Sequence, residues 1–415
     1  MASMNHVECL DTRFPFEFWR GMGGRVKVGP TRRELLRAGL VSGGLLVTGL
    51  GEVPGLFSAP KDNPFAGGKQ VGTVEFIHEG RVQMDAPLGA ALDGRLYTNL
   101  LELTGANQIT ATERFYLRTR ASKLLPDAKS WNIRIDGLLR KPSGISIETL
   151  NKAVRPMGIH LMECAGNSGF ARFGMISAAE WRGVPVADVL ENAETKTQAT
   201  HVFISGFDEY ETKSASSVAG ASWIFSREEL KAVGAFLATE MNGQALTPDH
   251  GAPVRLVVPG WYGCTCIKWV DEISLVDGKA EATSQMKEYA SRTQQNGIPE
   301  QASEYQPAFI EQAAMPIRVE KWLVAGKIKY RVVGIAWGGS RPVKALEIRF
   351  NPDEDYVRVD QFEQVHNDPW TLWSHVWSPS APGAYSIRLA VREPQVRARR
   401  LDSGYYVRTV DINEV

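Results

Sequence analysis

The last hundred residues of this 415-residue chain follow a strand-only pattern, and that pattern constrains the fold most strongly. Apolar runs alternate with turns such as Gly338-Gly339, Asn351-Pro352-Asp353 and Ala381-Pro382-Gly383. The runs are Ile317–Leu323, Lys327–Trp337, Ala345–Phe350, Tyr356–Val359, Trp370–Trp377, Ala384–Val391 and Tyr405–Ile412. About seven short strands over about 100 residues predict an immunoglobulin-like sandwich.

The preceding region mixes strands with short helices. Trp131–Gly137 alternates like a strand, Ser146 is a candidate helix cap, and Val254–Val258 is a buried strand that ends at Pro259-Gly260. Residues 280–312 are polar, as a linker would be. We therefore predict an α+β chain, with a mixed α/β domain over residues 61–290 and an all-β sandwich over residues 300–415.

Residues 1–60 resemble a targeting segment. A twin-arginine pattern, Thr31–Arg37, precedes a weakly apolar stretch, Ala38–Leu50, which is too short to span a bilayer. The twin-arginine route exports proteins that have already folded, so we expect a periplasmic location. The alternative is a chance Arg-Arg pair at the start of a short helix.

Composition excludes several classes of protein. Lys plus Arg and Asp plus Glu both number 47, which argues against a nucleic-acid-coating protein. Four cysteines are too few for a disulfide scaffold of this size. No run of 18 or more apolar residues occurs, so we expect no stable membrane span.

Cys164 lies in Met162-Glu163-Cys164-Ala165-Gly166-Asn167, where an apolar strand runs into a Gly-Asn turn. A bulky ligand can approach the backbone closely at such a turn. The thiol is open to three interpretations: a nucleophile, a soft metal ligand, or a buried apolar group.

A second segment runs from His250 to Trp269. His250 and Arg255 flank a strand, and a glycine-containing loop with Lys268 follows. Cationic side chains and exposed backbone N–H groups would suit a phosphate, although a strand with scattered surface charge is the alternative. Cys264-x-Cys266 lacks the Cys-x-x-Cys spacing of zinc and redox sites, so we interpret it as structural.

A third segment, Phe115–Arg120, places Arg118 and Arg120 two residues apart. On a strand these side chains would share one face and could grip an anion together. An exposed strand face is the alternative.

Together the three segments resemble the sulfite oxidase family of molybdopterin enzymes. The family carries Phe-Tyr-x-Arg, then Cys-Ala-Gly-Asn, then His-Gly-x-Pro-x-Arg-x-x-x-Pro-Gly followed by Lys-Trp, and each occurs here in that order. The family's C-terminal domain is a dimerisation sandwich. The resemblance runs from about residue 95 to residue 415.

The resemblance implies a role for individual residues. Cys164 would be the single protein ligand to molybdenum, whose partner is a pyranopterin dithiolene. The residues implied to hold the pterin and its phosphate are His250, Arg255, Lys268, Asp208 and the loop Gly263, Cys264 and Thr265. Arg118 would bind substrate, and Tyr289, preceded by Glu288, would be the active-site tyrosine.

Several positions depart from the family pattern. Ser168 and Gly169 replace the two arginines that usually follow Cys-Ala-Gly-Asn, and Arg172 is a candidate to fill the same space. Thr119-Arg120 resembles the sulfane dehydrogenase branch. We also expect the Arg-bearing C-terminal tail of the animal and plant enzymes to be missing. The anion pocket is therefore expected to be altered.

The leading functional hypothesis is a homodimeric oxidoreductase that oxidises sulfite or a related sulfur oxyanion by oxo transfer. No haem or iron–sulfur motif occurs, so electrons would pass to an external carrier such as a c-type cytochrome. The alternatives are sulfane sulfur on a carrier protein, an organic sulfur compound, or reduction of an S- or N-oxide. A non-catalytic protein without metal is the third class.

Overall fold

The structure is a computed structural model that describes residues 59–415, apart from residues 62, 90, 192, 215–219 and 368. The twin-arginine pattern therefore lies outside the described residues. The described residues form one compact unit with two hydrophobic cores. No helix in the described part is long and apolar enough to cross a membrane.

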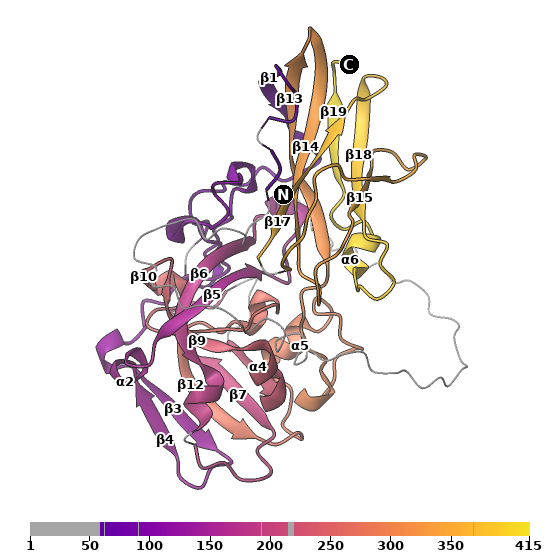
Figure 1. Ribbon diagram of the computed structural model, residues 1–415. Helices are drawn as coiled ribbons and strands as arrows, with labels where there is room; N and C mark the ends of the chain where they lie inside the picture. The colour runs from indigo at the N-terminus through magenta and orange to yellow at the C-terminus, as the bar shows by residue number, and fades with distance from the viewer. Residues whose placement is uncertain (1–58, 62, 90, 192, 215–219, 368) are drawn as a thin grey trace, which may run out of the picture. The chain divides into compact units, whose positions relative to one another are not determined.

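The first core lies around two five-stranded sheets (Figure 1). One sheet has the order β10-β9-β6-β5, with β11 also paired to β9, and its strands are β5 (Arg155–Glu163), β6 (Ile176–Pro185), β9 (Phe236–Met241), β10 (Gln244–Ala245) and β11 (Arg255–Val257). The other has the order β4-β3-β12-β7-β8, and its strands are β3 (Asn132–Gly137), β4 (Ser143–Ser146), β7 (His201–Gly206), β8 (Ser222–Ser226) and β12 (Val270–Val276).

Short helices connect these strands, and local chemistry sets their ends. They are α2 (Ile147–Asn151), α3 (Val186–Glu191), α4 (Arg227–Val233) and α5 (Ser284–Tyr289). Ser146 caps α2 as predicted, because its hydroxyl accepts the N–H of Thr149. Helix α4 begins with a capping box between Ser226 and Glu229 and ends at Gly234 in the left-handed conformation.

The second core lies within a β sandwich, so the predicted fold class is confirmed. The first sheet has the order β1-β13-β14-β17, with strands β1 (Lys69–Val74), β13 (Ala313–Val324), β14 (Lys327–Trp337) and β17 (Thr371–Trp377). The second has the order β16-β15-β18-β19-β2, with strands β2 (Phe76–Ile77), β15 (Glu347–Arg349), β16 (Val357–Arg358), β18 (Gly383–Ala390) and β19 (Arg408–Ile412). Helix α6 (Arg399–Asp402) precedes β19. Each of the predicted C-terminal runs overlaps one of these strands.

The N-terminal strands were expected in the first domain but pair with the sandwich. β1 pairs with the edge of β13, and β2 pairs with β19 (Figure 1). Both therefore cover backbone groups that an open sheet edge would expose. The second core also includes Leu161, Ala165 and Tyr262 from the first region, so sandwich residues pack directly against the Cys164 segment.

A buried ion pair anchors the segment after β2. Arg408 donates through Nε and Nη2 to the two carboxylate oxygens of Glu79, both at 2.6 Å, and its guanidinium lies 3.6 Å from the centre of the Phe76 ring. The side chains are only 4% and 12% exposed. Removing one partner would leave a buried charge without compensation.

We expect Glu79→Ala to lower the free energy of unfolding by about 3–5 kcal/mol. The matched control is Asp188→Ala, which breaks the exposed pair with Arg155 and should cost less than about 1 kcal/mol. Guanidinium denaturation of both variants measures the difference. Equal shifts in the two midpoints would contradict the role assigned to the Glu79–Arg408 pair.

Candidate active site

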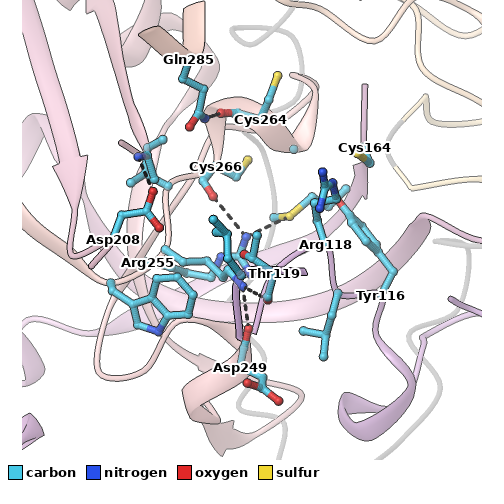
Figure 2. Close-up of a pocket in the computed structure, with 18 of the residues that line it drawn as sticks. Tyr116, Arg118, Thr119, Cys164, Asp208, Asp249, Arg255, Cys264, Cys266 and Gln285 are labelled. Carbon is cyan, nitrogen blue, oxygen red and sulfur yellow. Dashed lines mark hydrogen bonds between the residues drawn. The ribbon is translucent and has the colours of Figure 1, made fainter. Parts of the chain in front are cut away.

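A cavity with an empty volume of about 910 Å³ lies where the ends of the first-domain strands meet. It brings together most of the predicted site residues: Arg118, Cys164, Asp208, Arg255, Gly263, Cys264, Lys268 and Tyr289. Figure 2 shows Arg118 and Tyr116 beside Cys164, with Asp208 on the opposite side. Four predicted residues do not line it: Arg120, Arg172, His250 and Thr265.

Cys164 follows the last residue of β5 and forms part of the cavity wall. Its N–H donates to Met175 O at 2.9 Å, and its sulfur accepts the N–H of Gly166 at 3.4 Å. Burial raises the pKa of the thiol, whereas the Gly166 N–H, Arg118 and Arg292 act in the opposite direction. A bound metal would displace the proton, because the thiolate is the ligating form.

The loop that carries Cys164 is braced from both domains. Asn167 accepts the Met175 N–H at 3.0 Å and donates to Glu163 at 3.3 Å. Glu163 also accepts from Trp337 Nε1 at 2.8 Å and from the Tyr406 hydroxyl at 3.4 Å. Burial raises the pKa of this carboxyl. The sandwich therefore contributes directly to the position of the thiol.

Arg255 and Lys268 form the cationic part of the cavity. Arg255 donates to His250 O at 3.1 Å and to Cys266 O at 3.3 Å, while its buried Nε has no hydrogen-bond partner among the described residues. Lys268 Nζ donates to Thr119 O at 2.6 Å and Asp249 O at 2.9 Å. Burial, together with Arg255, lowers the pKa of Lys268 to about 7. An anion at this end would favour the charged forms of both.

His250 lies behind the cavity wall. Its Nε2 is 3.1 Å from Phe115 O, and its Nδ1 is 2.7 Å from the Thr247 hydroxyl. Burial lowers the pKa of His250 to about 4, so the ring is neutral at pH 7. Here His250 supports the Phe115 segment. Thr265 is buried too, and its hydroxyl donates to Tyr262 O at 2.9 Å.

The predicted strand through Arg118 and Arg120 is wrong. Only Leu117 forms a β-bridge, with Leu96, and the backbone bends at the residues that follow. Arg118 lines the cavity, whereas Arg120 Nε lies 3.6 Å from the carboxylate of Asp249. The two arginines therefore do not share one face.

Arg172 does not fill the predicted space beside Cys164. It ends a short 3-10 helix in the left-handed conformation, with φ of 49°. Its Nε donates to Gly80 O at 3.1 Å, on the segment that follows β2. The backbone geometry of the turn thus directs this side chain toward the N-terminal segment.

Helix α5 supplies three further groups to the cavity, Gln285, Glu288 and Tyr289. Gln285 Nε2 donates to Cys264 O, which fixes the loop after β11 to α5. Burial raises the pKa of the Tyr289 hydroxyl well above its usual value, so the hydroxyl remains a donor. Asp208 accepts the N–H groups of Gly220 and Ala221, and burial raises its pKa.

Sequence reasoning missed Arg292 and Arg400. Arg292 follows Tyr289 by three residues, and Arg400 lies in α6, far along the chain from Cys164. Arg400 Nη2 donates to Ala165 O and to Arg292 O, both at 2.8 Å. We expected no arginine from a C-terminal tail at this site, but Arg400 of α6 reaches the Cys164 loop. The Tyr289-x-x-Arg292 spacing near the end of a helix was the available signal.

The residues fit an anionic cofactor that holds a soft metal. Cys164 offers one sulfur, and the buried Arg255 and the half-buried Lys268 offer cations. Gly263 faces the Tyr116 hydroxyl so closely that a Cβ there would collide with it, so the loop backbone lies directly against the cavity wall. Cys164, Cys264 and Cys266 are free thiols. A single thiolate leaves the other coordination positions of a metal to the cofactor.

Comparison with known proteins agrees with this chemistry. Residues 121–284 match the family described as "Oxidoreductase molybdopterin binding domain". The mitochondrial sulfite oxidase of Macaca fascicularis is 28% identical over 331 residues, which cover 74% of this chain and 58% of that protein. The NADPH nitrate reductase of Beauveria bassiana is 26% identical over 290 residues, 60% of this chain and 32% of that protein.

Two further matches cover most of the matched protein. Sulfite oxidase of Arabidopsis thaliana is 24% identical over 293 residues, 62% of this chain and 72% of that protein. The crystal structure of the sulfane dehydrogenase SoxCD from Paracoccus pantotrophus superposes with a TM-score of 0.61 over 81% of this chain and 91% of the matched one. At 18% identity that superposition shows the fold. The predicted molybdenum–molybdopterin cofactor is confirmed by the domain match, and the predicted resemblance to the sulfite oxidase family of molybdopterin-dependent oxidoreductases is confirmed by these relatives.

Proposed function

We propose that this protein oxidises sulfite or a related sulfur oxyanion by oxo transfer and passes the electrons to an external c-type cytochrome. The observation that carries the proposal is the shared cavity of Cys164, Arg118 and the cationic pair Arg255 and Lys268. At one end of the cavity, Cys164 offers a metal ligand with Arg118 beside it. At the other end, Arg255 and Lys268 offer cations for the anionic part of the cofactor. Sulfite oxidases among the relatives support the substrate class.

When bound, the molybdenum cofactor supplies the two-electron oxo-transfer chemistry that amino-acid side chains lack. Cys164 would ligate the metal, while Arg255, Lys268 and Asp208 would orient the pterin. Arg118 would offset the charge of the substrate, and Tyr289 would donate a hydrogen bond to the transferred oxygen. The raised pKa of Tyr289 keeps that proton in place across the neutral range.

A second candidate is the reduction of an oxyanion of nitrogen or of an S- or N-oxide at the same centre. The fungal nitrate reductases among the relatives favour it, because they match 60% and 65% of the chain. Sulfane sulfur on a carrier protein is a third substrate, supported by the structural match to a sulfane dehydrogenase. A substrate screen separates these chemistries, since only the third requires a protein partner.

We also propose twin-arginine export to the periplasm and a homodimer formed through the sandwich. The twin-arginine run Thr31–Arg37 supports the first, since a cofactor inserted in the cytoplasm requires export of a folded protein. The resemblance of the sandwich to a dimerisation domain supports the second. Light scattering of the purified protein measures the dimer directly.

Elemental analysis tests the central proposal. We expect about one molybdenum per chain in protein purified from a cofactor-producing host. Turnover of sulfite with ferricyanide as acceptor should follow. Stoichiometric molybdenum with turnover of nitrate or an S-oxide alone would favour the second candidate. Absence of molybdenum would refute the proposal.

Cys164→Ser should abolish molybdenum-dependent turnover, because a hydroxyl is a poor substitute for a soft thiolate. The variant should retain its circular dichroism spectrum and oligomeric state. Cys266→Ser is the matched control, because the Cys266 sulfur accepts the Val258 N–H at 3.4 Å and is thereby turned toward backbone. Full activity in Cys164→Ser would rule out an essential thiolate ligand.

Arg118→Gln should raise the sulfite KM about tenfold to a hundredfold, which corresponds to the loss of one charged hydrogen bond worth about 1.5–3 kcal/mol. kcat should change less, because the side chain acts mainly on substrate binding. A neutral S-oxide assayed on the same variant is the control, and its KM should stay within about twofold of the wild type. An unchanged sulfite KM would remove the anion-binding role.

A further inference from the structure

The guanidinium of Arg292 lies close to Cys164, although Arg292 is not among the residues that line the cavity. A Cβ built on Gly166 would lie 3.7 Å from Arg292 Nη1 and 3.9 Å from Cys164 Sγ. The thiol and the guanidinium therefore border the same small space, and the lack of a side chain at Gly166 keeps that space open. Arg292 is exposed, whereas Cys164 is buried.

Two contacts fix Arg292 in this position. Its guanidinium lies over the ring of Tyr289, 5.3 Å from the ring centre. Its carbonyl oxygen accepts from Arg400, and the same Arg400 nitrogen donates to Ala165 O in the Cys164 loop. Arg400 itself packs between the rings of Tyr262 and Tyr405, at 4.8 and 5.2 Å. One side chain thus ties the Arg292 turn to the loop that carries the thiol.

The charge of Arg292 is available to an incoming anion. Its guanidinium lies over the Tyr289 ring, which does not neutralise it, and among the described residues it forms no ion pair. The turn after Cys164 carries Ser168 and Gly169, which are uncharged, and Arg172 is directed to Gly80 O. Glu288 adds a carboxylate to the cavity lining. Arg118 and Arg292 therefore both contribute positive charge near the thiol.

We propose that Arg292 is a specificity residue that recruits the substrate oxyanion and binds it between its own guanidinium and that of Arg118. This inference rests on the proposed function, and it assigns the second cation of the anion pocket to the turn after α5. A guanidinium presents paired N–H donors that match the oxygens of a sulfur oxyanion. Its exposure adds electrostatic steering, which weakens as ionic strength rises.

The test compares holoenzymes of the wild type, Arg292→Gln, Arg292→Lys and Lys287→Gln. Lys287 is the matched control, because it lies on α5 and its charge faces Glu300 at 3.1 Å. Sulfate serves as an unreactive oxyanion, and calorimetry measures its dissociation constant. The second readout is the dependence of kcat/KM for sulfite on ionic strength.

We expect Arg292→Gln to weaken sulfate binding about tenfold and to flatten the salt dependence of kcat/KM. Arg292→Lys should restore the salt dependence but only part of the affinity, because an ammonium lacks the paired donors. Lys287→Gln should stay within about twofold of the wild type. Gly166→Ala should also weaken sulfate binding while it retains molybdenum, because the methyl group would enter the space between Cys164 and Arg292.

Wild-type sulfate affinity and salt dependence in Arg292→Gln would overturn the inference, as would a wild-type holoenzyme that does not bind sulfate. Failure of the proposed function gives a different result. A molybdenum-loaded wild type that binds sulfate through Arg292 but turns over no sulfur oxyanion would refute the substrate and leave the anion site in place.

Discussion

The position of Cys164 depends on a buried carboxylate. Glu163 is fully buried, and hydrogen bonds from Trp337, Asn167 and Tyr406 offset the cost of burying its carboxylate. Trp337 and Tyr406 belong to the sandwich, so the polar group immediately before the proposed metal ligand is satisfied only when both domains are folded. Losing the Trp337 donor would leave Oε2 of Glu163 unpaired, which costs about 1–3 kcal/mol. The sandwich is therefore part of the scaffold of the site.

The end of the cavity away from Cys164 carries cationic side chains that suit a negatively charged group. Lys268 and Arg255 lie within one cluster, and burial lowers the pKa of each. Their hydrogen bonds are mainly to backbone carbonyls, which hold the cations in place without neutralising them. An anionic group that enters this region supplies the missing countercharge. Cofactor binding and the stability of the surrounding strands are thus coupled through the same two side chains.

Sequence patterns predicted which strands form more reliably than they predicted where individual side chains point. The strands after residue 316 were visible because they are rich in buried apolar residues, which alternate in β18 and run almost continuously in β13 and β14, and because turn residues separate them. β1 was missed because its residues are mostly exposed, so it carries little hydrophobic periodicity. Motif positions placed eight of the twelve predicted site residues in the cavity wall. His250 and Thr265 lie behind the cavity wall, where they bond to the backbone oxygens of Phe115 and Tyr262. A motif indicates that a residue is near a site, but it does not indicate which groups its polar atoms contact.

Arg172 and Arg292 show the same limit of sequence patterns, which do not indicate where a side chain points. Arg172 was close to Cys164 in sequence, but a left-handed turn directs it to Gly80 O. Arg292 is 128 residues from Cys164 and lies beside it, because the Arg400 side chain joins the two backbones.

That connection has a mechanical consequence. Helix α6, which carries Arg400, contacts β13 and β18 of the sandwich, so a shift of the sandwich moves both the thiol loop and the Arg292 turn together. We expect the separation between Cys164 and Arg292 to be less sensitive to a shift of the sandwich than the distance of either residue from Lys268. We therefore expect motions of the sandwich to affect cofactor orientation more than the local geometry around the substrate.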